Sequence, residues 1–316
     1  MIVYDSNTIG NAAHISAWVK AIEEAFVDTA NGLIEVPQRL HLDRGENTLL
    51  LMPCFGEKYF STKLVSVFPE NLKKKKPMIY GSVVLNDGET GEPLAVLDGS
   101  KLTAMRTAAV GTVGIKYLAP EGATTLGIIG LGIQGFHQAL FACQQRPIRK
   151  LFILDRSKPI MDRFKERFNA FYKDVEVFPC GSAMELCNAS EVIITATGAH
   201  QPVVPGKGAW WIGKTIIAIG SYKPVMREIP DEVFIDLKQV FVDTLHGLTE
   251  AGDLVEPYKK GLVLKDQIIP LSDLILGKQK IVGDTRFFKS VGMAAFDLYG
   301  ARLVYENLSQ KSDRHV

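Results

Sequence analysis

The sequence is poor in the features that mark several large classes of protein. It has no run of 18 apolar residues, and the opening MIVYDSN has no basic segment followed by an apolar one, so neither a membrane span nor a secretory signal is predicted. Lysine and arginine number 36 against 35 acidic residues, and this formal charge of +1 gives no reason to expect nucleic acid or a membrane surface as a partner. We therefore expect a soluble cytoplasmic protein.

Residues that commonly carry covalent or metal chemistry are few and scattered. The four cysteines, Cys54, Cys143, Cys180 and Cys187, include no C-x-x-C pair, which is typical of reduced thiols in a cytoplasmic protein. The six histidines form no H-E-x-x-H motif, and no G-x-S-x-G stretch is present. The sequence thus predicts no metal site and no covalent nucleophile, and any acidic ligand has to be bound by local cations.

The 316 residues favour two domains of different architecture. The first hundred residues combine a helical segment, HISAWVKAIEEAF, with alternating strands such as the hairpin GSVVLNDGETGEPLAVLDG, which indicates α+β structure. From about Leu126, apolar runs such as LGIIG, LFILD and EVIITAT alternate with helical stretches. Strands that are apolar on both faces and alternate with helices predict an α/β domain with a parallel sheet. A final helix is predicted from Val291 onward.

The stretch GIIGLGIQGFHQ has the pattern of a dinucleotide-binding turn. Gly130, Gly132 and Gly135 form G-x-G-x-x-G between a predicted strand and a predicted helix, and Asp155 follows the next strand 20 residues after Gly135. Gly130 permits the tight turn, Gly132 lets the backbone approach a pyrophosphate, and Gly135 lets helix and strand pack closely. The helix N-terminus offers free N–H groups and a positive dipole to the phosphates.

Asp155 bears on the choice of cofactor. Its carboxylate is placed to accept hydrogen bonds from the adenosine ribose hydroxyls, and it repels a 2′-phosphate. This favours NAD(H), while the neighbouring Arg156 leaves NADP(H) open, because its charge could tolerate the phosphate. A nicotinamide cofactor also fits a chain without a nucleophile motif, since hydride transfer depends on positioning and electrostatics.

Three cations outside this region stand in apolar or extended contexts. They are Arg39 in VPQRLHL, Lys63 in FSTKLVSV and Arg106 in LTAMRTAAVGTVG. The small residues after Arg106 indicate close packing or close approach of a ligand. Together the three could hold a carboxylate, arginine by a bidentate contact and lysine as a point charge.

Several separated strings resemble the ornithine cyclodeaminase and mu-crystallin family: STKLV, VVLNDGETGEPLAVLDG, LTAMRTAA, GLGIQG and FFKSVGMAAFDL. The resemblance covers nearly the whole chain. It implies an α/β fold in which a Rossmann domain, residues 116–291, is inserted into a discontinuous α+β domain for substrate binding and dimerisation, residues 1–115 plus 292–316. A homodimer is the implied assembly.

The resemblance also implies roles for individual residues. Arg39, Lys63 and Arg106 would grip the carboxylate of an amino or imino acid beside the nicotinamide. The residues implied to contact the cofactor, besides the three glycines, Asp155 and Arg156, are Thr107, Ile133, Gln134, Thr195 and Ser290.

Two departures from the family pattern bear on the chemistry. In GSYKPVMREIP, Tyr222 stands where deaminating members have an aspartate, and Leu50 in LLLMP stands where cyclodeaminases have a glutamate. Oxidising an α-amine needs a base, whereas reducing a cyclic imine needs a hydride donor and an anchored carboxylate. We therefore expect reduction of 1-pyrroline-2-carboxylate to L-proline, or of the six-membered homologue to L-pipecolate, without help from acidic side chains. Lys63 or a water would relay the proton, with His41 as a second candidate.

Other functions stay open at this stage. The chain could be an ornithine cyclodeaminase, or an amino-acid or opine dehydrogenase with a different base. It could also be an NADPH-loaded protein that binds a small ligand, as mu-crystallin illustrates for the family.

Overall fold

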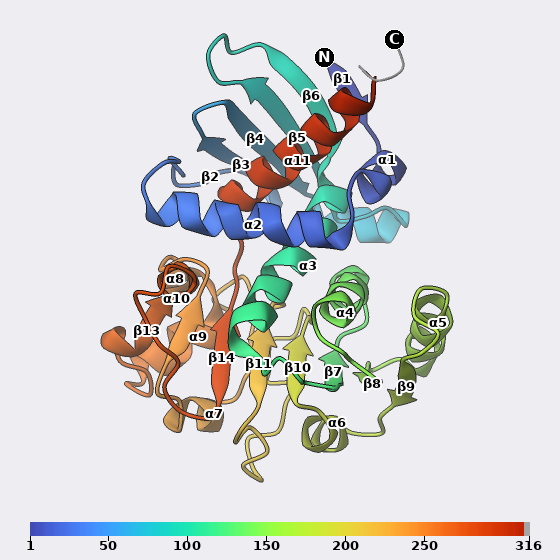
Figure 1. The fold of residues 1–316 in the computed structure, drawn as a ribbon, viewed down its shortest axis with the longest axis vertical. Helices are drawn as coiled ribbons and strands as arrows, with labels where there is room; N and C mark the ends of the chain where they lie inside the picture. The colour runs from blue at the N-terminus through green and yellow to red at the C-terminus, as the bar shows by residue number, and fades with distance from the viewer. Residues whose placement is uncertain (313–316) are drawn as a thin grey trace. The chain divides into compact units, whose positions relative to one another are not determined.

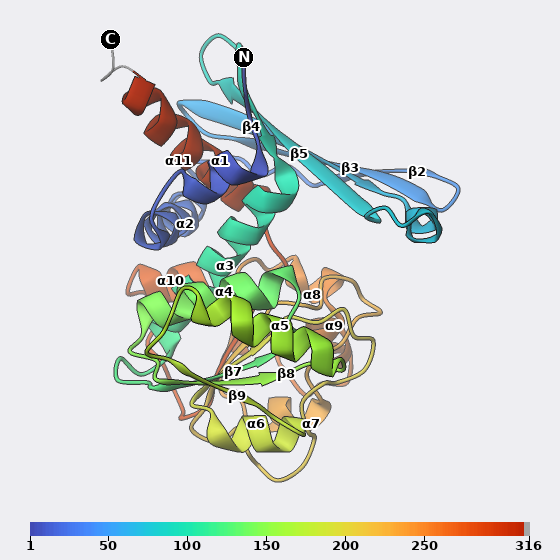
Figure 2. The same cartoon turned by 90° about the vertical axis from the view of Figure 1, so that its right-hand side faces the viewer.

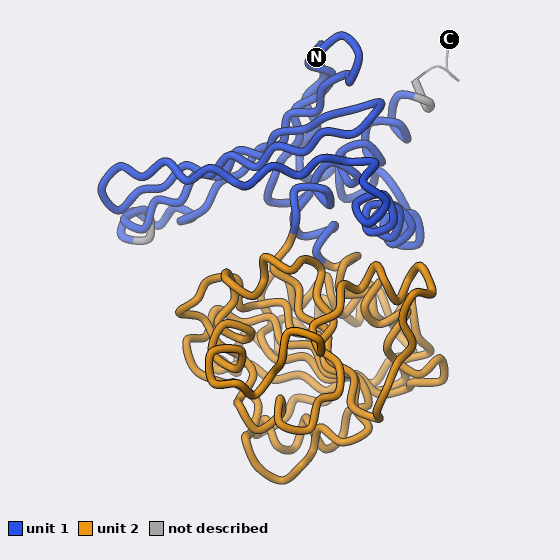
Figure 3. Tube along the Cα trace, turned by 90° about the vertical axis from the view of Figure 1, so that its left-hand side faces the viewer, with its two compact units in different colours: residues 1–107, 293–316 blue, residues 108–292 orange. Residues whose placement is uncertain are grey.

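The computed structural model describes residues 1–312, with the side chains of all of these except Leu72 and residues 310–312. The chain forms two compact units, drawn in separate colours in Figure 3. Unit 1 contains residues 1–107 and the C-terminal residues from 293, and unit 2 contains residues 108–292. The first boundary between these units falls at 107/108, and both this position and the predicted domain boundary at 115/116 lie inside one continuous helix, α3 (Gly99–Leu118).

Unit 1 is built on a six-stranded sheet in the order β1-β6-β5-β4-β3-β2. The strands are β1 (Ile2–Tyr4), β2 (Leu40–Arg44), β3 (Asn47–Phe55), β4 (Tyr59–Val67), β5 (Ile79–Asp87) and β6 (Pro93–Asp98). The predicted hairpin is confirmed, since β5 and β6 pair antiparallel. Asp87 Oδ1 accepts the Thr90 N–H at 2.8 Å in its turn, and Gly91 takes a positive φ of 76° there.

Helices cover one face of this sheet, as Figure 2 shows. They are α1 (Ser6–Asn11), α2 (Ile15–Ala30) and α11 (Ala294–Ser312), and α2 is the helix predicted from HISAWVKAIEEAF. Phe26 of α2 meets Phe296 of α11 with ring centroids 4.9 Å apart. The last helix begins at Ala294, later than predicted, because Gly292 takes a φ of 84° and the Val291 and Gly292 N–H groups bind the Asp243 carboxylate.

Unit 2 contains an eight-stranded parallel sheet in the order β13-β12-β14-β11-β10-β7-β8-β9 (Figure 1). Its strands are β7 (Thr125–Ile129), β8 (Lys150–Leu154), β9 (Glu176–Pro179), β10 (Val192–Thr195), β11 (Thr215–Ala218), β12 (Val240–Val242), β13 (Ile268–Pro270) and β14 (Arg286–Lys289). The order β9-β8-β7-β10-β11 is that of a Rossmann domain, in which strand order reverses beside the first strand. The expected α/β Rossmann fold is confirmed.

Helices lie on both faces of the unit 2 sheet, with α4 and α5 on one face and α6 and α7 on the other (Figure 2). The helices are α4 (Ile133–Gln145), α5 (Lys158–Asn169), α6 (Ala183–Ala189), α7 (Asp231–Ile235), α8 (Gly247–Glu250), α9 (Gly252–Lys259) and α10 (Leu271–Ile275). Because both faces are covered, the central strands β10 and β11 are buried along their whole length, which explains their unbroken apolar runs. Two 3-10 turns, η1 (Pro69–Lys74) and η2 (Lys265–Gln267), complete the structure.

Among the helices of residues 1–312, none combines the length and the apolar character that crossing a lipid bilayer requires.

Candidate functional site

Unit 1 brings two of the three predicted cations onto one carboxylate. Lys63 in β4 and Arg106 in α3 both contact Oδ1 of Asp297 in α11, at 3.2 Å from Lys63 Nζ and 3.1 Å from Arg106 Nε. Lys63 also donates to Thr103 Oγ1 at 2.6 Å. All three charged side chains are buried, and Asp297 is completely so. The pairing offsets part of the desolvation cost that each buried charge carries.

The burial of Lys63 determines its acid strength. The pKa of its ammonium is lowered from 10.5 to about 8: desolvation by burial is the largest cause, Asp297 opposes the shift, and charge repulsion from Arg106 and Arg39 adds to it. An amine with a pKa near 8 is largely protonated at neutral pH and releases its proton readily. Lys63 is therefore suited to proton transfer near neutral pH.

Arg39, the third predicted cation, directly precedes the first residue of β2. Lys63 pairs with Met52 of β3, and β2 pairs with β3 so that Leu40 lies opposite Leu51. Continuing that register by one residue places Arg39 opposite Met52, in the row of Lys63. Arg39 is half-buried, and its charge acts on Lys63.

His41 shares the sheet face of Lys63, in the next row, opposite Leu50. Its side chain is exposed on β2, the edge strand of the sheet. The structure therefore does not bring His41 into the buried group formed by Lys63, Arg106 and Asp297. Its role as a proton relay stays a prediction, with less support than that of Lys63.

Asp297 corrects the expectation of a site without acidic side chains. Tyr222 and Leu50 do replace the two carboxylates of the deaminating pattern, but a third carboxylate lies directly against Lys63 and Arg106. Oδ2 of Asp297 is buried and has no hydrogen-bond partner among the described residues. The signal in the sequence was an acidic residue inside the apolar run MAAFDLYG, which opens the last helix.

In unit 2, the glycine turn has the geometry expected of a dinucleotide site. Gly130 takes a φ of 92°, and a Cβ there would lie 2.6 Å from the Ala196 carbonyl oxygen. A Cβ on Gly135 would lie 1.9 Å from the carbonyl oxygen of Gly130. By contrast, a Cβ on Gly132 would meet nothing within 4 Å. Gly130 and Gly135 are thus required by the fold, whereas Gly132 borders open space.

The groups around the turn also fit a dinucleotide. Helix α4 starts at Ile133 with no side-chain cap, so its first N–H groups point from an uncapped helix N-terminus. The Asp155 carboxylate follows β8 and accepts the Leu131 N–H at 3.0 Å and the Ser157 N–H at 3.1 Å. These bonds hold an acidic group beside the turn, where a ribose hydroxyl would be bound.

The remaining predicted residues of this turn differ in exposure. Ile133 is 69 % exposed and Arg156 is exposed, so both are accessible. Gln134 is half-buried, and its Oε1 atom is buried without a hydrogen-bond partner among the described residues. The contacts of these three residues with the cofactor stay predictions. Gln134 Oε1 is a buried acceptor that a donor from a bound ligand could satisfy.

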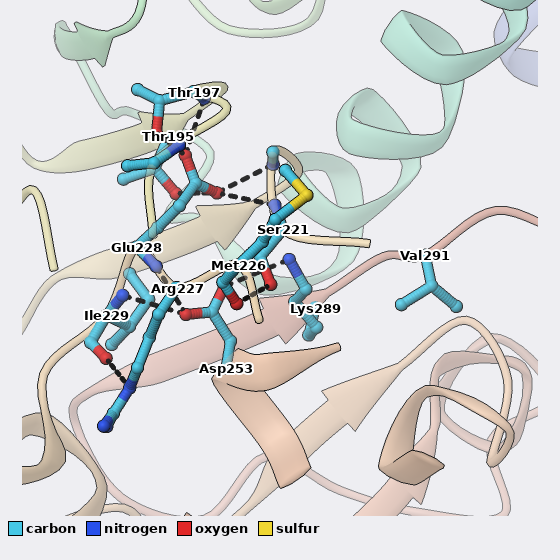
Figure 4. A network of polar contacts seen from close by, with 12 residues as sticks. Thr195, Thr197, Ser221, Met226, Arg227, Glu228, Ile229, Asp253, Lys289 and Val291 are labelled. Atoms are coloured by element: carbon cyan, nitrogen blue, oxygen red, sulfur yellow. Dashed lines mark hydrogen bonds and ion pairs between the residues drawn. The ribbon is translucent and has the colours of Figure 1, made fainter. Parts of the chain in front are cut away.

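A buried carboxylate that the sequence analysis missed, Glu228, joins the loops after β10 and β11 (Figure 4). Its Oε1 accepts the N–H of Thr197 at 2.7 Å and the hydroxyl of Thr197 at 2.8 Å. Its Oε2 accepts the Gly220 N–H at 2.7 Å, the Ser221 N–H at 3.2 Å and the Thr195 hydroxyl at 3.0 Å. Burial raises the pKa of Glu228, and Lys289 opposes that shift.

A second buried acid, Asp253 at the start of α9, supports Glu228. Asp253 Oδ1 accepts the N–H groups of Glu228 and Ile229 at 2.7 and 2.9 Å. Its Oδ2 lies 3.2 Å from the ammonium of Lys289, at the end of β14, and both side chains are fully buried. Figure 4 shows the resulting chain of contacts from Lys289 through Asp253 to Glu228.

Three predicted cofactor contacts lie on buried side chains. Thr107 is buried in α3, the Thr195 hydroxyl donates to Glu228, and the Ser290 hydroxyl donates to Asp243 Oδ2 at 2.7 Å. Burial raises the pKa of Asp243, and the Ser290 bond opposes the shift. Direct contact of these three residues with a cofactor stays a prediction. Tyr222, at the position of the missing aspartate, is 43 % exposed.

Comparison with known proteins places this geometry in a family. The model of the ornithine cyclodeaminase/mu-crystallin family matches residues 2–312. A Delta(1)-pyrroline-2-carboxylate reductase of Bacillus thuringiensis subsp. konkukian is 37 % identical over 271 residues, 83 % of this chain and 82 % of that protein.

Two solved structures share the whole fold. The Delta(1)-pyrroline-2-carboxylate reductase of Thermococcus litoralis, in complex with NADH and L-proline, superposes with a TM-score of 0.91 at 31 % identity, covering 99 % of this chain and 98 % of that one. An archaeal alanine dehydrogenase dimer with bound NAD gives 0.90 at 26 % identity, covering 99 % and 97 %. The protein is a member of the ornithine cyclodeaminase/mu-crystallin family.

Proposed function

We propose that the protein is an oxidoreductase that reduces a cyclic imino acid, 1-pyrroline-2-carboxylate or its six-membered homologue, with a reduced nicotinamide dinucleotide. The observation that carries the proposal is the charge balance around Asp297: two buried cations, Lys63 and Arg106, share one carboxylate oxygen. These three side chains have a net charge of +1, which favours an anionic ligand. The named relatives act on a ligand of this kind, an imino acid carboxylate.

Unit 1 supplies the carboxylate site. Asp297 contacts Arg106 at Nε, which fixes the plane of the guanidinium. A fixed plane favours bidentate binding of a substrate carboxylate through the outer amino groups. Arg39 adds a further cation on the same row of the sheet. This arrangement orients the ring of the imino acid without any covalent bond to the protein.

Lys63 supplies the proton. Its pKa of about 8 keeps the amine mostly charged at neutral pH, so it can protonate the imine nitrogen and raise the electrophilicity of the adjacent carbon. When bound, the reduced nicotinamide supplies the hydride that this carbon accepts. The product is the cyclic secondary amine, and Lys63 regains its proton from water. One imine, one hydride and one proton are consumed for each amine formed.

Unit 2 supplies the cofactor site, and we propose that it prefers NADH to NADPH. The Asp155 carboxylate is held beside the glycine turn by two backbone N–H groups, and a negative charge there repels a 2′-phosphate. Arg156 is exposed to solvent, which screens its charge, so we expect it to offset this repulsion only in part.

We further propose a homodimer formed through the unit 1 sheet. The face opposite to Lys63 carries Leu40, Leu42 and Leu49, which are 56, 53 and 39 % exposed. An apolar sheet face of this extent favours burial against a second copy. The archaeal alanine dehydrogenase of the same fold is a dimer. Light scattering should give twice the chain mass, and Leu42→Asp with Leu49→Asp should give a monomer.

The protein is also proposed to work in the cytoplasm. Its four cysteines are free thiols, and burial raises the pKa of Cys54, Cys143 and Cys187 to about 12 and that of Cys180 to about 11. Unreactive reduced thiols are typical of reducing compartments. Fractionation of the native cells tests the location directly.

One observation favours a second candidate function, oxidation of an amino acid. Asp297 gives the site a buried carboxylate beside Lys63. This carboxylate and the neutral form of Lys63 are both bases that could accept a proton from an amine. The named alanine dehydrogenase performs that kind of chemistry on the same fold.

The assay that tests the proposal measures both directions. Purified protein is mixed with NADH or NADPH and each cyclic imine, and loss of reductant is followed together with the amine formed. Reduction of either ring supports the proposal. Formation of NADH from an amino acid without imine reduction would favour a dehydrogenase, ammonia release from ornithine a cyclodeaminase, and tight cofactor binding without any turnover a binding protein.

A further inference from the structure

The carboxylate of Glu228 joins two loops that follow neighbouring parallel strands. Oε1 is occupied by the backbone and side chain of Thr197, after β10, and Oε2 by the backbone of Gly220 and Ser221, after β11. Each oxygen therefore belongs mainly to one loop, and the carboxyl group fixes the distance between them. Removing either oxygen as an acceptor releases one loop from the other.

These loops lie at the edge of the sheet where a Rossmann domain binds its ligand. β10 lies next to β7, and this is where the strand order reverses. Dinucleotides bind in the crevice at the carboxyl ends of the strands at that point. The glycine turn after β7 holds the pyrophosphate, so the loops after β10 and β11 are on the side of the nicotinamide half.

Close contacts transmit the position of these loops to the glycine turn. A Cβ on Gly220 would lie 2.2 Å from the Thr197 carbonyl oxygen, and a Cβ on Gly130 would lie 2.7 Å from Thr197 Cγ2. Thr197 is therefore packed between the two glycines, with its backbone against Gly220 and its side chain against Gly130. A shift of this loop by a few tenths of an ångström has no free space to enter on either side.

The hydrogen bonds favour an ionised Glu228. Three of its five donors are backbone N–H groups, which cannot accept a hydrogen bond in return. Lys289 lies behind it as a buried cation, linked through Asp253, and its charge favours the ionised form of Glu228, while the charge of Asp253 disfavours it. An amide in place of the carboxylate would turn N–H groups toward these N–H donors.

We propose that Glu228 is a positioning residue for the nicotinamide half of the cofactor site. It acts by holding the loops after β10 and β11 at the separation that this half of the dinucleotide requires. Asp253 and Lys289 hold Glu228 in turn. The inference goes beyond the proposed reaction, because it concerns cofactor binding and is independent of which imine is reduced.

The test is Glu228→Gln, measured by fluorescence titration with NADH and by calorimetric titration with ADP-ribose, which lacks nicotinamide. We expect the dissociation constant of NADH to rise about tenfold, as when a buried donor loses its acceptor, and that of ADP-ribose to change less than threefold. A variant that binds NADH like the wild type would overturn the proposal. Equal losses for NADH and ADP-ribose would overturn the assignment to the nicotinamide half.

A matched control exists at the opposite edge of the same sheet. Glu191 accepts the N–H groups of Thr124 and Thr125 at 2.8 and 2.9 Å and both their hydroxyls, joining β7 and β10 at their amino ends. Glu191→Ala should lower the melting temperature and leave NADH binding unchanged. If Glu191→Ala weakens NADH binding as much as Glu228→Gln, the role of Glu228 is merely structural.

A milder variant keeps the test open if Glu228→Gln does not fold. Thr197→Val removes one hydroxyl donor to Oε1 and keeps the backbone bond. We expect a threefold weaker NADH affinity, on the order of half the loss from the carboxamide on a logarithmic scale. An unchanged affinity in this folded variant would count against the proposal. If the wild type binds NADH but reduces neither cyclic imine, that result would contradict the proposed function and leave the proposal for Glu228 standing.

Discussion

The ammonium of Lys63 and the carboxylate of Asp297 lie 3.2 Å apart, with 5 % and 0 % of the two residues exposed to solvent. The same Oδ1 atom contacts Arg106, so a single oxygen balances two cations. Because the three side chains come from a strand and two helices, this oxygen also fixes the relative positions of β4, α3 and α11. The acid strength of Lys63 and the orientation of Arg106 consequently depend on one residue.

Replacing that residue by Asp297→Asn should change the acid strength of Lys63. The negative charge of Asp297 raises the pKa of Lys63, so its removal should lower that pKa below about 8. The alkaline limb of the kcat/KM profile should move to lower pH, and stability should fall by about 3 kcal/mol because two buried cations lose their counter-ion. Glu306→Gln, which removes a surface pair with Lys58, is the control. An alkaline limb at an unchanged pH would show that Asp297 does not act on Lys63.

The pH dependence of the wild type follows from the same lysine. If ammonium is the acid, kcat/KM for imine reduction should be level below the Lys63 pKa of about 8 and fall about tenfold per pH unit above it. Lys63→Arg stays charged across this range, so its residual activity should show no fall near pH 8. Steady-state rates between pH 6 and pH 10 at saturating cofactor measure both profiles. Activity that rises above pH 8 would instead indicate that neutral Lys63 acts as a base.

The contribution of Lys63 to stability should rise with pH, whereas its contribution to activity falls. The folded-state pKa of Lys63 is below the unfolded value of 10.5, so the unfolded chain binds more protons between about 8 and 10.5. The Lys63 contribution to stability is therefore present above that range and is lost as pH falls through it. Chemical unfolding of the wild type and of Lys63→Met at pH 7.5 and pH 9.5 isolates this contribution, and an equal change in both proteins would contradict it.

Substrate binding should depend on Arg106. Arg106→Ala should lower kcat/KM by the equivalent of about 2–5 kcal/mol, mostly through KM, because the substrate carboxylate and Asp297 both lose a buried partner. Arg302→Ala, which breaks a partly exposed pair with Glu24 in the same unit, should have little effect. Isothermal titration with pyrrole-2-carboxylate, a flat mimic of the imine, separates binding from turnover. Unchanged binding of this mimic to Arg106→Ala would remove Arg106 from the carboxylate site.

Much of the fold could be predicted from local sequence patterns. The β5–β6 hairpin follows from alternation around a Gly-containing turn, and the turn at Gly130 follows from glycine spacing and the position of Asp155. Both features depend on residues within about thirty positions of each other. The order of the sheet does not, since β14, the last strand in the chain, lies between β11 and β12.

Important parts of the candidate site could not be predicted in this way, because their residues are far apart in the sequence. Asp297 is 234 residues from Lys63 and 191 from Arg106 in the chain, so no periodicity joins them. Glu228 lies in an irregular loop, where no helical or strand spacing indicates that five donors converge on it. Local pattern also could not indicate where the units divide, because α3 is one continuous helix on both sides of residue 107. Local sequence context singled out the three cations and the family resemblance implied their role, and the structure added Asp297 as the acidic partner of Lys63 and Arg106.

Cofactor choice should depend on Asp155. Asp155→Ser removes the negative charge but keeps a small polar group that can accept from the Leu131 and Ser157 N–H groups, so the turn should survive. Without repulsion of the 2′-phosphate, the ratio of kcat/KM for NADPH to that for NADH should rise about tenfold, mainly through KM. Asp162→Ser, at an exposed position of α5, removes an equal charge from the same unit and should leave the ratio unchanged. If the wild type already prefers NADPH, or if both substitutions shift the ratio equally, the carboxylate of Asp155 does not select the cofactor and Arg156 becomes the residue to replace.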